Sequence, residues 1–163
     1  MTVLPIRTFP DPVLRQKAKK IRTIDGSIKK LIADMVETLH AEPGRAGLAA
    51  PQIGVPLRVI VINLPEEERD IVLINPEIVK KSGERLVTEG CLSVPGYYGE
   101  IKRAQQVTAK GRDENGREVR IKAQGLLAQA LEHEIDHLNG RLYLDHVESP
   151  EKLRRVEAEE TGL

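Results

Sequence analysis

The sequence predicts an α+β fold in which antiparallel or mixed sheets wrap around one central helix. Three segments support this class. Residues 125–138 form an apolar run with helical spacing, residues 57–64 are rich in Val and Ile, and an Asn-Gly turn at 115–116 separates two strand-like runs. Helix-like and strand-like segments do not alternate regularly, which argues against a parallel βαβ architecture. The 163 residues are expected to form a single domain with its own core.

The first half of the chain is expected to contain one surface helix and two strands. Residues 1–24 begin irregularly, with a turn at 9–12 and a helical turn within 13–18. Ser27 is expected to cap the next helix. Its apolar stripe is Ile28, Leu31, Ile32, Met35 and Leu39. A buried strand follows at 57–64, and a second strand at 71–75 is expected to stop at Pro76.

The second half is expected to contain a hairpin and the central helix. Residues 85–92 are expected to be extended and residues 93–99 to form a loop. Strands at 107–110 and 118–122 are expected to pair through the Asn-Gly turn. The helix at 125–138 should end at Asn139-Gly140, because either residue tolerates a left-handed backbone. Residues 148–163 are expected to be a charged C-terminal tail or short helix that begins near Ser149-Pro150.

Composition gives no indication of a charged or apolar binding partner. The chain has 25 basic and 25 acidic side chains, so its net charge is zero and neither a nucleic-acid nor a membrane-surface role is indicated. No apolar run is long enough to span a membrane, and residues 1–12 lack the apolar segment of a signal peptide. Cys91 is the single cysteine, which excludes an internal disulfide. A cytoplasmic location is therefore expected.

The central helix carries a metal-binding pattern, His133-Glu134-Ile135-Asp136-His137. His133 and His137 are one turn apart, so both imidazoles leave the helix on one side and can meet one divalent ion. Glu134 lies one position further round, where it can reach a water on that ion without binding the ion itself. The pattern is typical of a metal hydrolase and predicts a metal-binding helix at the centre of the fold.

A catalytic site of this kind needs a third protein ligand. In metzincin proteases the third ligand is a histidine, but Tyr143 stands at that position, which excludes this class. In gluzincin proteases a later glutamate completes the site, and Glu157 is the available residue, in a charged run that resembles a solvated helix. The remaining candidate is Cys91, within Glu89-Gly90-Cys91-Leu92-Ser93.

Three stretches in order resemble the signature motifs of bacterial peptide deformylase. They are residues 47–52 (GLAAPQ), 89–93 (EGCLS) and 133–137 (HEIDH), and the likeness extends over nearly the whole chain. One position departs from the family pattern, because the first motif opens with Arg45-Ala46-Gly47 in place of Gly-apolar-Gly. Gly44 is displaced by one residue, and Arg45 would then lie at the rim of the substrate cleft.

The resemblance implies that Cys91, His133 and His137 hold the metal. It implies hydrolysis of the N-formyl group from formyl-methionine at the start of new polypeptides, with release of formate. Glu134 would serve as general base and acid, and the Gln52 amide and the Leu92 backbone N–H would stabilise the oxyanion. Glu89 and Asp136 would orient the ligands, with Arg103 as their partner.

Substrate contacts are implied at four positions. Gly47 and Gly90 would meet the peptide through their backbones, Gly47 by accepting it as an added strand. Leu126 and Ala130 lie seven and three residues before His133, and they would line the pocket for the methionine side chain.

The ion and the partners are also implied by the resemblance. It implies Fe²⁺ as the native ion, with Zn²⁺, Ni²⁺ or Co²⁺ able to occupy the same ligands. It implies an N-formylmethionyl peptide as substrate, a transient ribosome association and a monomer. Two alternatives stay open: a gluzincin-like endopeptidase that uses Glu157, and a deformylase-like domain that binds peptides without catalysis.

Overall fold

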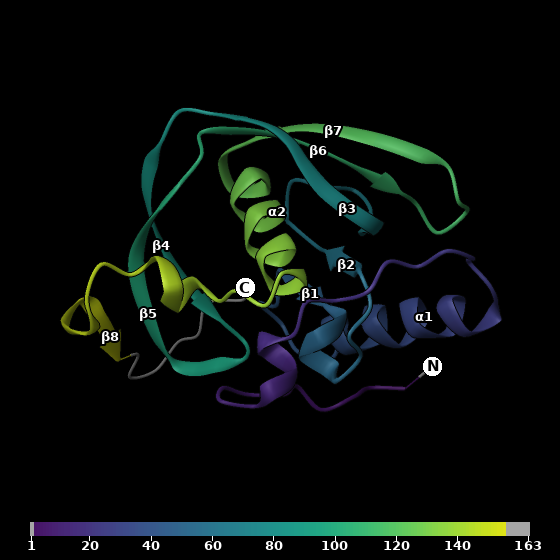
Figure 1. The fold of residues 1–163 in the computed structure, drawn as a ribbon, viewed down its shortest axis with the longest axis horizontal. Helices are drawn as coiled ribbons and strands as arrows, with labels where there is room; N and C mark the ends of the chain where they lie inside the picture. The colour runs from purple at the N-terminus through teal and green to yellow at the C-terminus, as the bar shows by residue number, and fades with distance from the viewer. Residues whose placement is uncertain (1, 156–163) are drawn as a thin grey trace.

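The helix α2 (Gly125–Leu138) lies at the centre of the molecule with sheet on both sides (Figure 1). The structure is a computed structural model and describes residues 2–155. One sheet has the order β1-β2-β3-β6-β7 with antiparallel neighbours throughout. Its strands are β1 (Gly47–Ala49), β2 (Val59–Ile62), β3 (Ile71–Ser82), β6 (Gln106–Arg112) and β7 (Glu118–Gln124).

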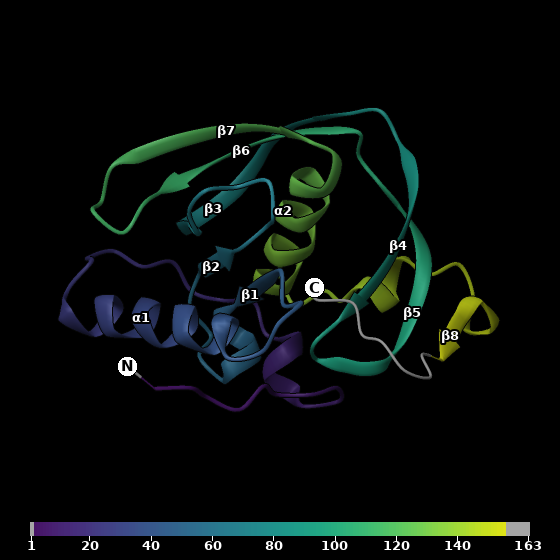
Figure 2. The same cartoon turned by 180° about the vertical axis from the view of Figure 1, so that it is seen from behind.

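The second sheet has the order β4-β5-β8 and is also antiparallel. Its strands are β4 (Arg85–Cys91), β5 (Val94–Arg103) and β8 (Leu153–Arg155). It lies on the opposite side of α2 from β2, as the view from behind also shows (Figure 2). The expected α+β class, with antiparallel sheets around a central helix, is confirmed. Within residues 2–155, no helix is long and apolar enough to cross a membrane.

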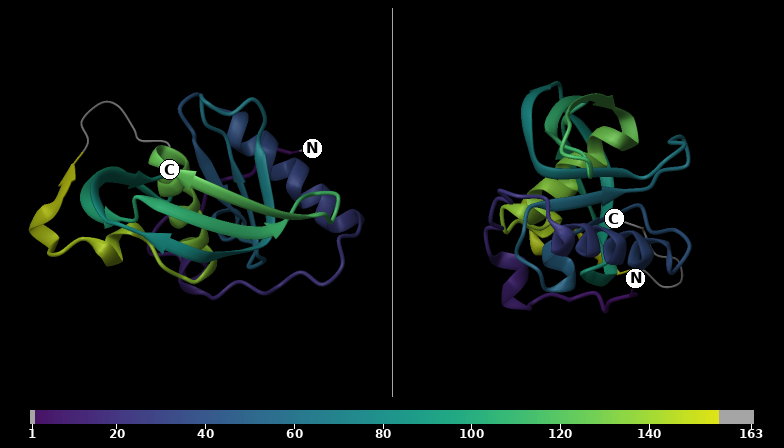
Figure 3. Two further views of the ribbon diagram at one scale, coloured as in Figure 1. Left: turned by 90° about the horizontal axis from the view of Figure 1, so that it is seen from above. Right: turned by 90° about the vertical axis from the view of Figure 1, so that its right-hand side faces the viewer.

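The strand β2 is buried on both faces because it lies between two helices. Val59 and Val61 pack in a cluster with α1 (Gly26–His40), whereas Ile60 and Ile62 pack in the cluster that contains α2. Side chains of a strand alternate between the two faces of the sheet, so an unbroken apolar run suits this position. The helix α1 and the strand β8 lie at opposite ends of the molecule (Figure 3).

The helix α2 begins and ends at the residues that the sequence predicts, 125 and 138. Its last helical residue is Leu138, and Gly140 takes the left-handed backbone conformation with φ +73°. The C-terminal carbonyls are bonded, since Leu138 accepts the N–H of Ala18 at 2.8 Å and the Nη1 of Arg58 at 3.0 Å. Residues 2–155 also contain four short 3-10 helices: η1 (Pro12–Arg15), η2 (Ala50–Ile53), η3 (Tyr143–His146) and η4 (Pro150–Lys152).

The prediction that Ser27 caps α1 is wrong. Asp25 is the capping residue, and its carboxylate accepts the backbone N–H groups of Ser27 and Ile28 at 3.0 and 3.2 Å. Ser27 lies inside the first turn, where its hydroxyl donates to the same carboxylate at 2.6 Å. Aspartate and serine are both strong capping residues, and the sequence offers both within three positions.

The prediction that Pro76 ends a strand at residue 75 is also wrong. The strand β3 continues to Ser82, with a register shift against β6 between Ile74 and Glu77. Asn75 has φ +53°, and its side-chain amide bonds the backbone of Ile21 through both its oxygen and its nitrogen, at 2.8 and 2.7 Å. This irregularity accommodates the missing N–H of Pro76 without ending the strand.

Residues 93–99, expected as a loop, belong almost entirely to β5. The register pairs Cys91 with Val94, so Leu92 and Ser93 alone form the turn between β4 and β5. The Pro and Gly residues of this stretch indicate a loop locally, but pairing with β4 overrides them. Near the C-terminus, a 3-10 turn at 150–152 is followed by β8, which pairs with β5, where a tail or short helix was expected. The rest of that segment, 156–163, lies outside the described residues.

Candidate metal centre

Cys91 and the two histidines of α2 converge at one buried point. Cys91 is the last residue of β4, and its Sγ lies 3.3 Å from Nε2 of His137. Nε2 of His137 lies 3.3 Å from Nε2 of His133. The three possible ligand atoms are all within 4.8 Å of one another, and all three residues are buried. This group could therefore hold one metal ion.

The donor set and its spacing fit a tetrahedral ion. Metal–nitrogen and metal–sulfur bonds of about 2.0 and 2.3 Å place neighbouring tetrahedral ligands roughly 3.3–3.8 Å apart, which matches the separations here. Burial and the charge of His133 hold the pKa of His137 well below its usual value, so this imidazole is neutral, the form that binds metals. Three protein ligands leave a fourth position for water or substrate.

A buried carboxylate orients His133. Nδ1 of His133 is hydrogen-bonded to Glu89, which fixes the ring so that Nε2 faces the site. Nε and Nη2 of Arg103 donate to the same carboxylate at 3.0 and 2.5 Å, and Gln129 Nε2 donates at 3.2 Å. Burial alone would raise the pKa of Glu89, but the charge of His133, its hydrogen bond and Arg103 hold the pKa at about 2. Glu89 is therefore an anion at neutral pH.

The negative groups around His133 favour a cation at this point. Burial lowers the pKa of His133, but the charges of Glu89, Glu134 and Cys91 outweigh burial and raise it well above its usual value. A proton on His133 can supply that positive charge, and so can a divalent ion, in whose presence the imidazole is neutral. The charges around His133 and the spacing of the three donor atoms therefore both favour a bound cation.

A chain of ion pairs extends from Glu89 toward the surface. Arg103 Nη1 lies 2.8 Å from Asp136 Oδ2, and His146 Nε2 lies 2.9 Å from the same oxygen. Burial would raise the pKa of Asp136, but its bonds to His146 and Arg103 lower it. The expected partnership of Arg103 with Glu89 and Asp136 is therefore present, and it ties together β4, β5, α2 and η3.

Glu134 carries the least compensated charge of the site. It is fully buried, and neither carboxylate oxygen has a hydrogen-bond partner among the described residues. Burial raises the pKa of Glu134 to about 7 against the opposing charge of His133. A carboxyl group poised near neutral pH is suited to taking up and releasing a proton.

Gln52 and Ser93 border the cysteine. Gln52 is fully buried in η2, and its Oε1 accepts the N–H of Ala49 at 2.9 Å. Its Nε2 lies 3.1 Å from the Ser93 hydroxyl and 3.6 Å from Cys91 Sγ. The backbone N–H of Ser93 also donates to Cys91 Sγ at 3.4 Å. Leu92 follows Cys91 in the turn between β4 and β5.

The expected substrate positions lie on both sheets and on α2. Gly47 in β1 and Gly90 in β4 are buried, as is Ala130, whereas Leu126 in the first turn of α2 is 42% exposed. Arg45 does not reach over the site. Its Nη1 donates to the carbonyl of Thr38 at 2.6 Å, and its Nη2 pairs with Glu42 at 3.1 Å, which holds the guanidinium at the C-terminal end of α1.

Sequence reasoning assigned no role to Ser93, Gln129 or His146. Gln129 had a signal, because it precedes His133 by one helical turn and must share its face. Ser93 lies beside Cys91 because β4 pairs with β5, and His146 lies beside Asp136 because the chain turns back after α2. Spacing along the sequence indicates neither contact.

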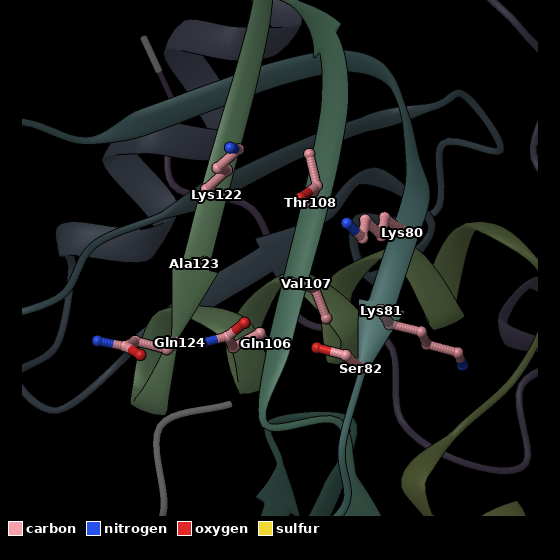
Figure 4. A pocket seen from close by; sticks show the side chains of 9 residues that line it. All are labelled: Lys80, Lys81, Ser82, Gln106, Val107, Thr108, Lys122, Ala123 and Gln124. Carbon is pink, nitrogen blue, oxygen red and sulfur yellow. The ribbon is translucent and has the colours of Figure 1, made fainter.

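A separate hollow of about 380 Å³ lies on the sheet formed by β3, β6 and β7 (Figure 4). Lys80, Thr108 and Lys122 are cross-strand neighbours there. None of the three candidate metal ligands lines this hollow, so the centre described above is distinct from it.

Comparison with known proteins identifies the family. The polypeptide deformylase family model matches residues 3–153. The peptide deformylase of Dehalococcoides mccartyi strain CBDB1 is 57% identical over 156 residues, which cover 96% of this chain and 93% of that protein. The peptide deformylase of Thermomicrobium roseum is 50% identical, with 98% of this chain and 94% of that protein covered.

Solved structures agree. A crystal structure of a peptide deformylase from Legionella pneumophila superposes with a TM-score of 0.88 at 47% identity, covering 93% of this chain and 89% of that one. One from Ehrlichia chaffeensis in complex with actinonin gives 0.88 at 45% identity, covering 93% and 92%. On the matched family model, the near-full-length relatives and the shared fold, this chain belongs to the polypeptide deformylase family.

Proposed function

We propose that this deformylase removes the formyl group with one divalent ion held by Cys91, His133 and His137, and with Glu134 as the proton carrier. The observation that supports it most directly is the convergence of three buried donor atoms within 4.8 Å of one another. Neither a gluzincin-like endopeptidase nor a non-catalytic peptide-binding domain is favoured by the family match. Glu157, on which the first alternative depends, lies outside the described residues.

In this proposal the residues of the chain divide the chemistry among them. A bound divalent ion supplies Lewis acidity, which polarises the formyl carbonyl and makes water a better nucleophile at neutral pH. Glu134 accepts a proton from the attacking water and returns it to the amine that leaves. The Gln52 amide and the Leu92 backbone N–H donate to the oxyanion. The position of Gln52 Nε2, 3.6 Å from Cys91 Sγ, supports its part.

The peptide is proposed to bind as an added strand. The strand β1, which contains Gly47, is at an edge of the five-stranded sheet, and β4, which contains Gly90, is at an edge of the other sheet. An extended peptide pairs with such edges through main-chain hydrogen bonds, which are independent of sequence and suit an enzyme with many substrates. Leu126 and Ala130 are proposed to contact the methionine side chain, Leu126 from the open end of the pocket.

We propose Fe²⁺ as the native ion, with Zn²⁺, Ni²⁺ or Co²⁺ able to replace it, because a thiolate and two imidazoles bind all four. The substrate is an N-formylmethionyl peptide. A cytoplasmic location, a monomeric state, a transient association with the ribosome and the absence of specific nucleic-acid binding are proposed with it, as is a single catalytic domain over residues 1–163.

The test is formate release from formyl-Met-Ala-Ser, combined with metal analysis, in anaerobic and aerobic preparations. Cys91→Ala, His133→Ala and His137→Ala should each lose both metal and activity, whereas Glu157→Ala should keep both. Full metal occupancy in Cys91→Ala would refute the ligand set. Loss of metal in Glu157→Ala would support the gluzincin alternative, and metal binding without formate release would support the non-catalytic one. Activity that decays in air in the iron form, but persists in the zinc form, identifies a ferrous enzyme.

A further inference from the structure

Gly47 faces the carboxylate of Glu134. A Cβ built on Gly47 would lie 2.4 Å from Oε2, 2.9 Å from Cδ and 3.1 Å from Cγ of Glu134. Separations below 3.0 Å are not tolerated between a Cβ and another heavy atom, so a side chain at position 47 and the present position of the Glu134 carboxylate exclude each other. The backbone of Gly47 does not require glycine for its conformation, because Gly47 is not among the residues with positive φ.

Sterics are the main restraint on the Glu134 carboxylate. Neither oxygen has a hydrogen-bond partner among residues 2–155, although the residue is fully buried. Gly47 is itself buried in β1, and its register with Ile62 of β2 fixes its main chain. The neighbouring residue Ala46 is also bonded to the sheet, since its carbonyl accepts the N–H of Asn63 at 2.8 Å. The wall next to Glu134 is therefore part of a rigid sheet.

We infer that Gly47 is a positioning residue for Glu134: the space left by its missing side chain holds the carboxylate where it can exchange a proton with the attacking water. This inference rests on the proposed role of Glu134 as proton carrier. It gives Gly47 a function separate from its proposed backbone contact with the peptide. A side chain at position 47 forces the carboxylate out of its present position, and proton transfer depends on the exact position of the base.

Kinetics distinguish the two roles of Gly47. Gly47→Ala should lower kcat by about 10²-fold or more, within the range typical of lost general base catalysis, while KM for formyl-Met-Ala-Ser changes little. Glu134→Ala removes Cγ, Cδ and both carboxylate oxygens, and with them every atom that the Cβ would meet. In the Glu134→Ala background, adding Gly47→Ala should therefore change the residual kcat less than about 3-fold, since the two effects are coupled. Gly26→Ala is the matched control, because a Cβ at Gly26 meets nothing within 4 Å.

A thermal measurement tests the same contact without catalysis. Gly47→Ala should lower the melting temperature of the wild-type chain, because the added methyl group overpacks the site. It should leave the melting temperature of the Glu134→Ala variant unchanged, because that variant lacks the overlapping atoms. Metal content, measured in each variant, should stay at the wild-type level.

The inference is overturned if Gly47→Ala raises KM while kcat is unchanged, or if it lowers the melting temperature equally in the presence and absence of the Glu134 side chain. If Glu134→Ala itself retained wild-type kcat, the proposed proton carrier would be wrong. The thermal coupling would still report whether Gly47 and Glu134 share one space, so the two failures are distinguishable.

Discussion

At the residue scale, the site is built from polar groups of two kinds. Glu89 is buried and bonded by His133, Arg103 and Gln129, so it is fully compensated. Glu134 is buried and has no such partner among the described residues. An uncompensated buried carboxylate is costly, and natural sites retain one where its reactivity is used. The contrast between the two glutamates supports the proposed division of roles, in which Glu89 orients His133 and Glu134 transfers the proton.

The spacing of His133, Glu134 and His137 was sufficient to predict which residues meet on α2, because helix geometry relates neighbours along the chain. It was not sufficient to predict the contact of Gly47 with Glu134 or of Ser93 with Cys91. Those contacts depend on how β1 and the turn between β4 and β5 approach the helix, and no local pattern encodes that approach. The motif resemblance indicated the residues, and the structure adds a reason for glycine at position 47, where a Cβ would meet Glu134.

The first prediction concerns Glu134. Glu134→Gln keeps the shape of the side chain but removes its ability to take a proton, so it should retain the metal and lower kcat by ~10²–10⁴-fold. Glu132→Gln, two residues earlier in α2, is the control. Its carboxylate accepts the N–H of Ala104 at 2.8 Å, a bond that an amide oxygen can also make, and its other oxygen lies 3.8 Å from the exposed Lys81 Nζ. Steady-state formate release and metal analysis decide the outcome. Near-normal turnover in Glu134→Gln would contradict the assignment.

At the element scale, segments whose structure depends on nearby residues followed the sequence. The hairpin β6–β7 and both helices formed where spacing and turn residues indicated. The second half of β3, from Pro76 to Ser82, and the first half of β5 were missed, because Pro76 and the Pro-Gly stretch after Ser93 are loop signals when read alone. Long-range pairing and the bond between Asn75 and Ile21 outweigh those signals. Tertiary context overrides local preference in both segments.

A second prediction concerns the C-terminal end of α2, one residue beyond His137. Arg58 is buried, and its guanidinium donates to the carbonyls of Leu138 and Ala18 at 3.0 and 3.3 Å and to the side-chain oxygen of Asn139 at 3.0 Å. A positive charge at the C-terminal end of a helix also interacts favourably with the helix dipole. Arg58→Met should lower the free energy of unfolding by about 2–4 kcal/mol, since buried carbonyls lose charged donors.

Urea unfolding of the metal-free protein measures this effect. Arg58→Lys should fall between the wild type and Arg58→Met, because it keeps the charge but loses the forked geometry. Arg120→Met, at an exposed position of β7, should change stability by less than about 0.5 kcal/mol. An equal effect of the two Arg→Met changes would remove the case for Arg58 as the anchor of this helix end.

A third prediction concerns the attachment of the N-terminal segment to α1. The Asp34 carboxylate accepts hydrogen bonds from Nζ of Lys30 at 2.7 Å and from the backbone N–H of Thr2 at 2.8 Å. These bonds lower the pKa of Asp34, although burial acts to raise it. A carboxyl group with a depressed pKa stabilises the fold above its ordinary range, and this contribution is lost as the pH falls through the folded-state value. The wild type should therefore be more stable than Asp34→Asn at pH 7, and the difference should shrink below about pH 4.

Urea midpoints at pH 7 and pH 3 test this sign. Glu66→Gln, in the exposed turn between β2 and β3, is the control and should show little difference at either pH. A gap between the wild type and Asp34→Asn that widened on acidification would contradict the role of the ionised carboxylate.

At the scale of the whole molecule, the metal centre and the ion pairs join parts that the sheets leave separate. Cys91 comes from the second sheet and the two histidines from α2, so an ion held by these three residues would link the β4–β5 hairpin to the central helix. Arg103 makes the same connection through Glu89 of β4 and Asp136 of α2. The sequence indicated which residues interact. It did not indicate that the second sheet packs against α2, because that packing depends on contacts between segments far apart in the chain.

The last prediction follows from that arrangement. An ion that binds only the folded chain stabilises it by RT ln(1 + [M]/Kd), about 4 kcal/mol when the free ion is at 1,000 times its Kd. For a chain of this size that corresponds to a rise in melting temperature of roughly 8–16 °C.

Stripping the ion with a chelator should reverse the rise in the wild type. The shift in melting temperature should nearly vanish in Cys91→Ala, which loses the ligand from β4. It should be unchanged in the control His40→Gln, because the His40 imidazole pairs with Asp70, at 2.8 Å, and is not one of the proposed ligands. A chelator effect of equal size in the Cys91 and His40 variants would show that the ion does not join the sheet to the helix, because the link through β4 requires the thiolate.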